Sequence, residues 1–216
     1  RHAVRPQAVL FLKADHRVVC PLTEYAVHRA RIIAPLLQLL LHAAQPAQGA
    51  SVIDVGTGAG FPSVPCAVAR GDLKLTLLDS LGKRVDWLNQ VCAQLGLEGI
   101  QAIHARAEEQ ALVKGYRDSF DFVTARAVAN LRLLGELCLP YVKVGGQFLA
   151  MKTTESASEV EEAAHCIKLL GGRAEEPVDY AIPGTQVTHR VLPIRKLAPT
   201  LKGYPRRWAR IQKQPL

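Results

Sequence analysis

Short apolar runs recur along the chain and alternate with stretches of helical periodicity. The runs cover residues 51–55, 74–79, 100–104, 120–125 and 147–152. A strand buried on both faces of a parallel sheet has a continuous apolar run, whereas a covering helix has one apolar stripe. The alternation therefore predicts a doubly wound α/β sheet assembled from βα units.

Helix signals fall between these runs. Ser80 is placed to cap a helix that reaches Leu95, and Ser156 with Glu159 forms a capping-box sequence that opens a helix reaching Leu170. The helices with the clearest apolar stripes are predicted over 80–95, 131–141 and 156–170. Two last strands, over 178–182 and 190–196, are expected to pair antiparallel at the sheet edge. They bring the mostly parallel sheet to seven strands.

The chain divides into three regions on this reading. Residues 1–48 are expected to form an N-terminal helical cap, whose main helix begins at Thr23 and bends at Pro35. Residues 49–196 form the α/β domain, and residues 197–216 form a basic C-terminal tail.

The formal net charge of +8 comes from one end of the chain. Residues 180–216 contain eight Lys and Arg and no Asp or Glu, whereas residues 1–179 hold nineteen of each sign. Such asymmetry predicts a polyanionic partner, and nucleic acid rather than a membrane, because no amphipathic apolar face accompanies the charge. Arg206, Arg207 and Arg210 are the residues that we expect to hold RNA.

Composition excludes several other classes. No run approaches the ~20 apolar residues of a membrane span, and no signal sequence is recognisable, so we expect a cytoplasmic protein. The five cysteines are odd in number and widely spaced, with no Cys-x-x-Cys pair. They therefore indicate neither a disulfide framework nor a metal site.

The sequence 54–60, Asp-Val-Gly-Thr-Gly-Ala-Gly, joins the first strand to a helix that opens at Pro62. Gly56, Gly58 and Gly60 can take positive φ and let backbone N–H groups approach a ligand. Asp54 would repel a diphosphate but attract a ligand with an ammonium and a sulfonium group, which points to S-adenosylmethionine (SAM). Another nucleotide site and a purely structural tight turn remain open alternatives.

Ligands of such sheets bind beyond the carboxyl ends of the strands, which selects a few polar residues. Asp79 could accept both ribose hydroxyls or serve the following helix as a cap. Glu108, next to Ala107, could edge the adenine or be a solvated acid. Arg126 and Lys152, at two strand ends, could grip RNA or form structural salt bridges.

The fourth strand ends in Thr-Ala-Arg-Ala-Val, without the Asn/Asp-Pro-Pro-Tyr/Phe clamp of amino-group methyltransferases or the Pro-Cys nucleophile of cytosine-C5 enzymes. The Pro65-Cys66 pair lies in the first helix and is interpreted as packing. Guanine N7 has a free lone pair and no proton to remove, so its methylation needs only in-line placement of the reactants. A guanine-N7 site fits the residues that are present.

Five stretches carry a family resemblance: 54–62, 76–84 (Thr-Leu-Leu-Asp-Ser-Leu-Gly-Lys-Arg), 106–109, 124–128 and 143–152. From about residue 50 to the end, the chain resembles the bacterial small-subunit ribosomal RNA methyltransferase G family. The resemblance implies a class I SAM-dependent methyltransferase with a Rossmann-like fold. It further implies N7-methylation of guanine 527 in 16S ribosomal RNA by a monomer acting on the small ribosomal subunit.

The resemblance also implies roles for single residues. Gly56 and Phe61 would line the SAM pocket, Asp79 would hold the ribose, and Ala107 with Glu108 would border the adenine. Catalytic roles on the methyl-transfer side and at the RNA are implied for three cations: Arg126, Lys152 and Arg195.

The chain departs from the family pattern at Ser63, at Thr153 and over residues 1–48. The alternatives are therefore a SAM methyltransferase acting on another RNA or on a small molecule, or a catalytically decayed rRNA-binding module.

Overall fold

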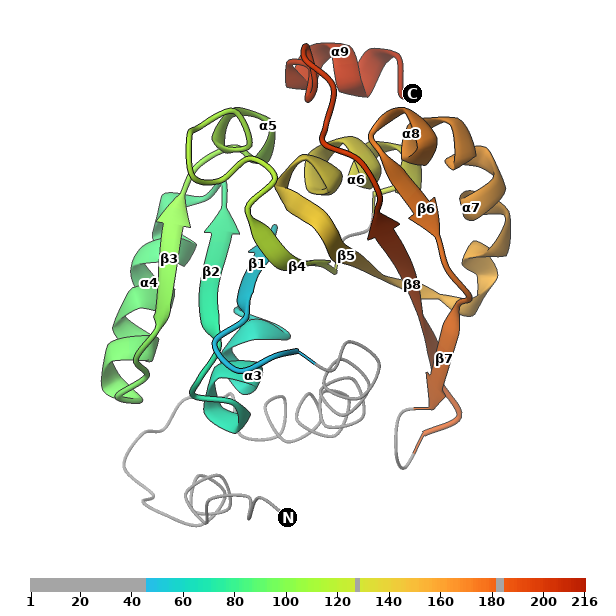
Figure 1. Ribbon diagram of the computed structural model, residues 1–216. Helices are drawn as coiled ribbons and strands as arrows, with labels where there is room; N and C mark the ends of the chain where they lie inside the picture. Colours follow the sequence, from blue (N-terminus) through green and yellow to red (C-terminus); the bar gives the residue numbers. More distant parts are fainter. Residues whose placement is uncertain (1–45, 127–128, 182–184) are drawn as a thin grey trace.

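The computed structural model describes residues 46–126, 129–181 and 185–216 of the 216-residue chain. These residues form one twisted sheet with helices on both faces (Figure 1). The helical cap expected over residues 1–48 lies almost wholly outside the described residues.

Most strands follow the predicted apolar runs closely, but the fifth begins at Val142, five residues before the predicted start at 147, and includes Gly145 and Gly146. They are β1 (Ser51–Val55), β2 (Lys74–Asp79), β3 (Ile100–His104), β4 (Phe120–Ala125), β5 (Val142–Thr153), β6 (Gly172–Ala174), β7 (Val178–Ala181) and β8 (Thr188–Lys196). The helices are α3 (Ser63–Ala69), α4 (Gly82–Gln94), α5 (Ala107–Gln110), α6 (Leu131–Cys138), α7 (Ala157–Glu162), α8 (Ala164–Leu169) and α9 (Trp208–Lys213), with short 3-10 turns η1 (Leu139–Tyr141) and η2 (Thr154–Ser156).

The sheet order is β3-β2-β1-β4-β5-β8-β6, with β7 also pairing with β8. Strands β1 to β5 are parallel, and β8 is antiparallel to β5. The sheet therefore has the predicted seven positions, but its outermost position is shared by two short strands. One of them, β6, was not predicted, because three residues are too few to show a periodicity.

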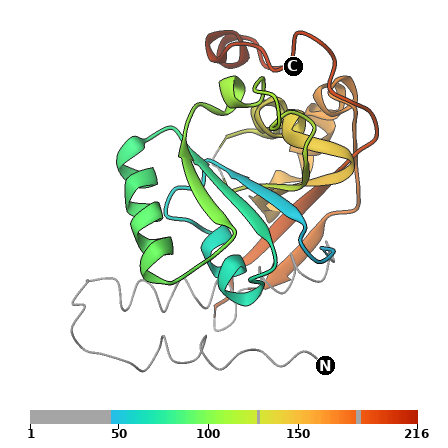
Figure 2. The same ribbon diagram turned by 60° about the vertical axis from the view of Figure 1, so that its left-hand side comes forward.

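Buried side chains divide into two layers on opposite faces of the sheet. On one face, β1, β4, β5 and β8 pack against α6 and α8, with Ile53, Phe148 and Leu134 in the core. On the other face, β2 packs against α3 and α4, with Leu77 and Leu88 fully buried. Figures 1 and 2 show α3 and α4 on the side away from α6 and α8. The doubly wound fold is confirmed.

Two predicted helix starts are wrong in detail. The N-cap of α4 is Leu81, not Ser80, and its backbone N–H donates to Asp79 Oδ1 (2.9 Å). The Ser156–Glu159 capping box does not form: Ser156 Oγ donates to the Thr153 carbonyl, and no side chain caps α7. The predicted helix from 156 to 170 is instead divided into α7 and α8 at Ala163.

The last twenty residues are packed against the sheet domain. The Lys196 ammonium is fully buried, where it donates to the Leu139 carbonyl (2.7 Å) and pairs with Asp118 (3.1 Å). Burial lowers the pKa of Lys196, and the Asp118 carboxylate opposes that shift. The Arg117 guanidinium donates to the carbonyls of Thr200, Leu201 and Tyr204. Figures 1 and 2 place α9 beyond α5 and α6, away from α3.

The eight cations of residues 180–216 fall into two equal groups. Four are paired with carboxylates from earlier in the chain or from β7: Arg190 with Asp179, Arg195 with Glu175, Lys196 with Asp118, and Arg206 with Glu136. The other four, Lys202, Arg207, Arg210 and Lys213, are exposed and form no ion pair with any described residue. Arg206, which the sequence suggested for RNA binding, is therefore a structural residue.

Among the residues that the structure describes, no helix has the length and apolar character required to cross a membrane.

The Arg206–Glu136 pair yields a stability prediction. Glu136 is fully buried, and Arg206 donates to both of its carboxylate oxygens, at 2.8 Å from Nε and 2.6 Å from Nη2. We expect Arg206→Ala to lower the free energy of unfolding by ~3–5 kcal/mol, because it leaves a buried carboxylate without its partner. Denaturant unfolding measures the change. The control is Arg207→Ala, at an exposed neighbour, which should change stability by less than ~0.5 kcal/mol; equal effects of the two substitutions would contradict this account.

Candidate cofactor and methyl-transfer site

The glycine turn follows β1 at the carboxyl edge of the sheet. Gly56, Gly58 and Gly60 have φ values of 71°, 60° and 81°, as the sequence predicted. A Cβ at Gly56 would meet no atom within 4 Å, and one at Gly58 would meet only a backbone oxygen at 4.0 Å. A Cβ at Gly60 would instead lie 2.7 Å from Val64 and 2.8 Å from Leu88. The first two glycines thus leave an open cradle, and the third permits close helix packing.

Asp79 ends β2 directly beside this turn. Its Oδ2 accepts a hydrogen bond from the Gly58 N–H (2.9 Å), and its Oδ1 accepts one from the Leu81 N–H. The Arg84 guanidinium lies 3.5 Å from Oδ2. The carboxylate thus fixes both the turn and the start of α4, as the capping role requires, and the ribose role stays a prediction.

Asp54 is a buried carboxylate in β1. It accepts hydrogen bonds from Thr57 in the turn (2.7 Å) and from Thr124 in β4 (2.8 Å). Burial raises the pKa of Asp54 to about 6, and the polar neighbours Thr57, Thr124 and Ser63, together with the Arg126 charge, oppose the rise. Ser63 Oγ is itself buried without a well-formed hydrogen bond in the described part of the chain.

Ala107 and Glu108 open α5 just after β3. Glu108 is buried, and Arg106 Nε donates to its Oε1 (2.6 Å). The Ala107 carbonyl accepts a hydrogen bond from the buried Tyr141 hydroxyl (2.6 Å). Glu108 is thus not the solvated acid of the alternative interpretation. Phe61 is half-buried at the end of the glycine turn.

Arg126 follows the last residue of β4 and is exposed. Its charge acts on two groups: it opposes the rise that burial causes in the pKa of Asp54 and in the pKa of Tyr180. Its guanidinium makes no hydrogen bond or ion pair with a described residue. An unpaired cation at the carboxyl edge can bind an anionic or carbonyl-bearing ligand.

Lys152 lies near the end of β5 but is buried. Its ammonium donates to the Ala129 carbonyl (2.6 Å) and to Glu159 Oε2 (2.6 Å). The same Glu159 oxygen accepts the Leu131 N–H (2.8 Å), at the start of α6. Lys152 therefore ties β5 to the segment between β4 and α6, and its geometry is that of the structural salt bridge considered from the sequence.

Arg195 is not brought to these residues. Arg195 in β8 faces Gln147, at the amino end of the apolar part of β5, and pairs with Glu175. Because β8 is antiparallel, Arg190 is the residue that faces Lys152. Five residues along a strand span roughly 17 Å.

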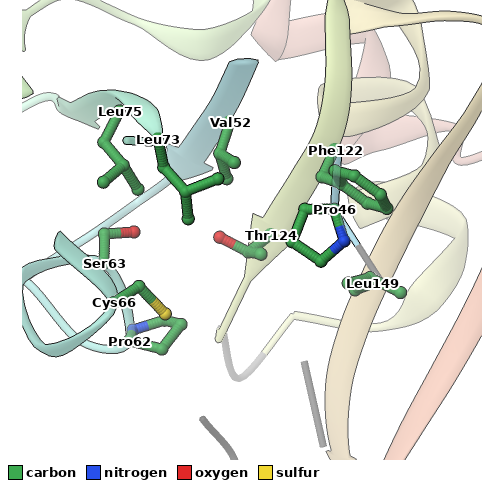
Figure 3. Close-up of a pocket in the computed structure, with 10 residues that line it drawn as sticks. All are labelled: Pro46, Val52, Pro62, Ser63, Cys66, Leu73, Leu75, Phe122, Thr124 and Leu149. Carbon is green, nitrogen blue, oxygen red and sulfur yellow. The ribbon is translucent and has the colours of Figure 1, made fainter. Parts of the chain in front are cut away.

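A small cavity of about 30 Å³ lies on the sheet face that carries α3. Figure 3 shows the Ser63 and Thr124 hydroxyls pointing into the space between them, with apolar side chains around them. None of the residues predicted to bind a cofactor lines it. Cys66 lines it, and burial raises the pKa of this thiol to about 12, so Cys66 is a packed residue rather than a nucleophile.

Sequence reasoning missed four contributors to this edge: Thr57, Thr124, Ala129 and Glu159. Thr57 and Thr124 carry a signal in retrospect, since one lies inside the glycine turn and the other lies in the strand next to β1. The contact made by Ala129 uses its backbone carbonyl, and no sequence pattern encodes it.

Comparison with known proteins adds independent support. The family model for rRNA small subunit methyltransferase G matches residues 27–181. The ribosomal RNA small subunit methyltransferase G of Clostridium beijerinckii is 48% identical over 166 residues, covering 77% of this chain and 70% of that protein. The protein of the same name from Lachnoclostridium phytofermentans is 44% identical over 177 residues, covering 82% of this chain and 73% of that protein.

Solved structures resemble the fold at low identity. TYW2 from M. jannaschii, crystallised in complex with AdoMet, has a TM-score of 0.57 and 13% identity, covering 76% of each chain. Such identity speaks for the fold alone. Together, the comparisons confirm the family and the methyltransferase fold predicted from the sequence; the roles of single residues stay predictions.

The pKa of Asp54 predicts how stability changes with pH. The folded protein holds this proton up to about pH 6, whereas an unfolded aspartate loses it near 3.8. The stability associated with the protonated carboxyl is thus fully present below about pH 3.8 and is lost as the pH rises through about 6. We expect the parent to lose roughly 3 kcal/mol relative to Asp54→Asn over this window.

Urea unfolding of both proteins between pH 4 and pH 7 measures this difference, and taking the difference removes the contribution of the other carboxylates. A difference between parent and variant that stays constant across the window would contradict a raised pKa at the buried Asp54.

Proposed function

The chain belongs to the rRNA small subunit methyltransferase G family, and from this premise we propose that it transfers a methyl group from SAM to N7 of guanine 527 in 16S ribosomal RNA. The domain over residues 49–196 binds the cofactor. The enzyme acts as a monomer in the cytoplasm, on small-subunit rRNA that is free or within an assembling particle.

The observation that carries the proposal is the grouping at the carboxyl edge of β1 to β4. Parallel strands align their carboxyl ends, so the Gly56–Gly58 cradle, Asp79, Glu108 and Arg126 lie along one edge. Adenosine-type ligands of doubly wound sheets bind at this edge. Asp79 and Glu108 are buried carboxylates, and Arg126 has no ion pair with a described residue. Packing of apolar side chains does not require these charges at the edge.

The residues fit SAM from one end to the other. Asp79 offers its carboxylate to the ribose hydroxyls, and Ala107 with Glu108 borders the adenine. The glycine backbone at Gly56 and Gly58 can be approached closely by the ligand, because no described side chain lies within 4 Å of a Cβ built at either position. Asp54, at the base of the cradle, supplies negative potential for the ammonium and sulfonium groups.

Methylation of guanine N7 makes few demands on the chain. Bound SAM supplies an activated methyl group, which passes from sulfur to the N7 lone pair while the sulfur keeps the electrons of the broken bond. Since N7 carries no proton, neither a general base nor a covalent nucleophile is required. The buried Cys66 thiol, whose pKa is raised, agrees with the absence of a covalent nucleophile from this reaction.

Lys152 serves the reaction through other residues in this proposal. With Glu159, it fixes the Ala129 carbonyl and the Leu131 N–H, which bound the segment that follows Arg126. Lys152 and Glu159 are therefore positioning residues that hold the connection from β4 to α6, and Arg126 is the cation that meets the RNA.

The surface of α9 supplies a wider RNA contact. Arg207, Arg210 and Lys213 are exposed there and form no ion pair with a described residue. Trp208 connects this helix to the adenine side of the site, because the Arg106 guanidinium lies 5.8 Å from the centroid of its ring. The Arg106 side chain also donates to Glu108.

The test of the proposed function combines SAM titration with a methylation assay. The parent should bind SAM by calorimetry and transfer labelled methyl groups from SAM to small ribosomal subunits that lack the modification. Asp79→Ala should weaken SAM binding by at least ~10-fold, since it removes a charged acceptor. The control is Asp86→Ala, at an exposed acid of α4, which should leave the SAM Kd within about twofold.

Each outcome separates a candidate function from the others. Label on an atom other than guanine N7 would refute the assignment in favour of a different methyltransferase. A parent that does not bind SAM would favour the decayed rRNA-binding module.

The charge on α9 predicts a salt dependence. Replacing Arg207, Arg210 and Lys213 by Ala should weaken RNA binding and lower the slope of log K against log salt by about 2, because each lost phosphate contact removes roughly 0.7–0.9 from the slope. The control is Lys74→Ala, at the amino end of β2, which should not change the slope. Filter binding across a salt series measures it; an unchanged slope in the triple variant would remove α9 from the RNA contact.

A further inference from the structure

The β7–β8 pair places two aromatic rings side by side. Tyr180 in β7 faces His189 in β8 across the antiparallel pair. Their ring centroids are 5.8 Å apart, and the ring planes differ by 23°, which is a stacked arrangement. Both side chains are half-buried, so part of the stack is accessible to solvent.

This aromatic pair lies at the same edge as the methyl-transfer side. His189 faces Thr153, the last residue of β5, one position beyond Lys152. Tyr180 packs against the apolar cluster that contains Val52 and Leu149, on the sheet face toward which alternation also directs Asp54. The stack therefore lies on the same face of the sheet as Asp54, near the carboxyl end of β5.

Arg126 lies within electrostatic reach of the stack. Burial raises the pKa of Tyr180 to about 12, and the Arg126 charge opposes that rise. The same guanidinium charge acts on Asp54. In the sheet order, β4 lies between β1 and the β7–β8 pair, so Arg126, which directly follows β4, lies between the glycine cradle and the aromatic pair.

The two strands that carry the stack are fixed to each other by an ion pair. On the other face of the β7–β8 pair, the neighbouring residue Arg190 binds both carboxylate oxygens of Asp179 (2.6 and 2.8 Å) and so fixes β7 to β8. The Tyr180 hydroxyl makes no hydrogen bond with a described residue, whereas the buried Tyr141 hydroxyl donates to a carbonyl. Because Tyr180 is only half-buried, its ring rather than its hydroxyl is the group that we consider for a ligand.

We propose that Tyr180 and His189 form a stacking surface that holds the extruded target purine beside Arg126, with its N7 turned toward the methyl donor. This inference rests on the proposed function. A base taken out of its RNA stack loses stacking energy, and an aromatic surface restores it without reading the base edge. Arg126 then contacts O6 or a phosphate, because N7 itself must remain free to receive the methyl group.

The variants remove the rings but keep the bulk. Tyr180→Leu and His189→Leu retain apolar volume against the sheet, and Tyr180→Phe retains the ring. We expect each Leu variant to lower kcat/KM for unmodified small-subunit RNA by about 10-fold or more, the range of one lost base–aromatic stack. The SAM Kd should stay within about twofold, and Tyr180→Phe should stay close to the parent. The control is Thr188→Ala, at an exposed neighbour in β8, which should behave as the parent does.

A binding measurement gives a readout that does not require methyl transfer. An RNA that carries 2-aminopurine at the target position should fluoresce less when bound to the parent than when bound to either Leu variant, because stacking on the rings quenches the extruded base. If Tyr180→Leu does not fold, as judged by SAM binding, His189→Leu carries the test.

The possible failures are distinguishable. A parent that binds SAM and unmodified small-subunit RNA but leaves guanine N7 unmethylated would overturn the proposed function. Leu variants that match the parent within twofold in kcat/KM, and also in 2-aminopurine quenching, would overturn the stacking surface while leaving the proposed function intact.

Discussion

A single buried carboxylate connects the parts of the candidate site. Asp54 accepts one hydrogen bond from the glycine turn, through Thr57, and one from β4, through Thr124. Burial of an ionised carboxylate costs free energy, and this cost raises the pKa of Asp54. The hydrogen bonds from the two threonine hydroxyls offset only part of it. In return, the end of β4 is fixed relative to the turn, and this places Arg126 beside the cradle.

Pairing of charged groups also determines the structure at the β8 side of the sheet. Residues 180–216 contain eight cations, and carboxylates from earlier in the chain pair with four of them. Asp118 lies before β4 and Glu136 lies in α6, yet both pair with residues after 195. The pairs hold the C-terminal segment against α6. Of the four cations that form no ion pair with a described residue, Arg210 and Lys213 lie in α9 and Arg207 is its N-cap, so a polyanion can contact three of them at one helix.

Most of the fold could be predicted from the sequence, and the departures share a cause. Strands β2, β3 and β4 begin and end at the predicted residues, because a parallel strand that is buried on both faces has a continuous apolar sequence. Ser80 and Ser156 were assigned as caps from local patterns, but tertiary partners determine those helix starts. Asp79 takes the N–H at the start of α4, and Glu159 turns to Lys152 and Leu131. Local spacing cannot reveal a partner that the fold supplies.

The candidate site shows the same limit for charged residues. The sequence placed Arg126 and Lys152 together as two cations at strand ends, and it identified the correct edge for both. Burial then separates their roles. A lysine ammonium that is removed from water must be paired, and Lys152 meets Glu159 and a carbonyl. Arg126, at the exposed end of β4, needs no partner from the described chain. A strand-end cation stays free for a ligand only where solvent or ligand can replace a protein partner. Exposure, together with the absence of an ion pair within the described chain, is therefore the ground on which we propose Arg126 as a binding residue and Lys152 as a positioning residue.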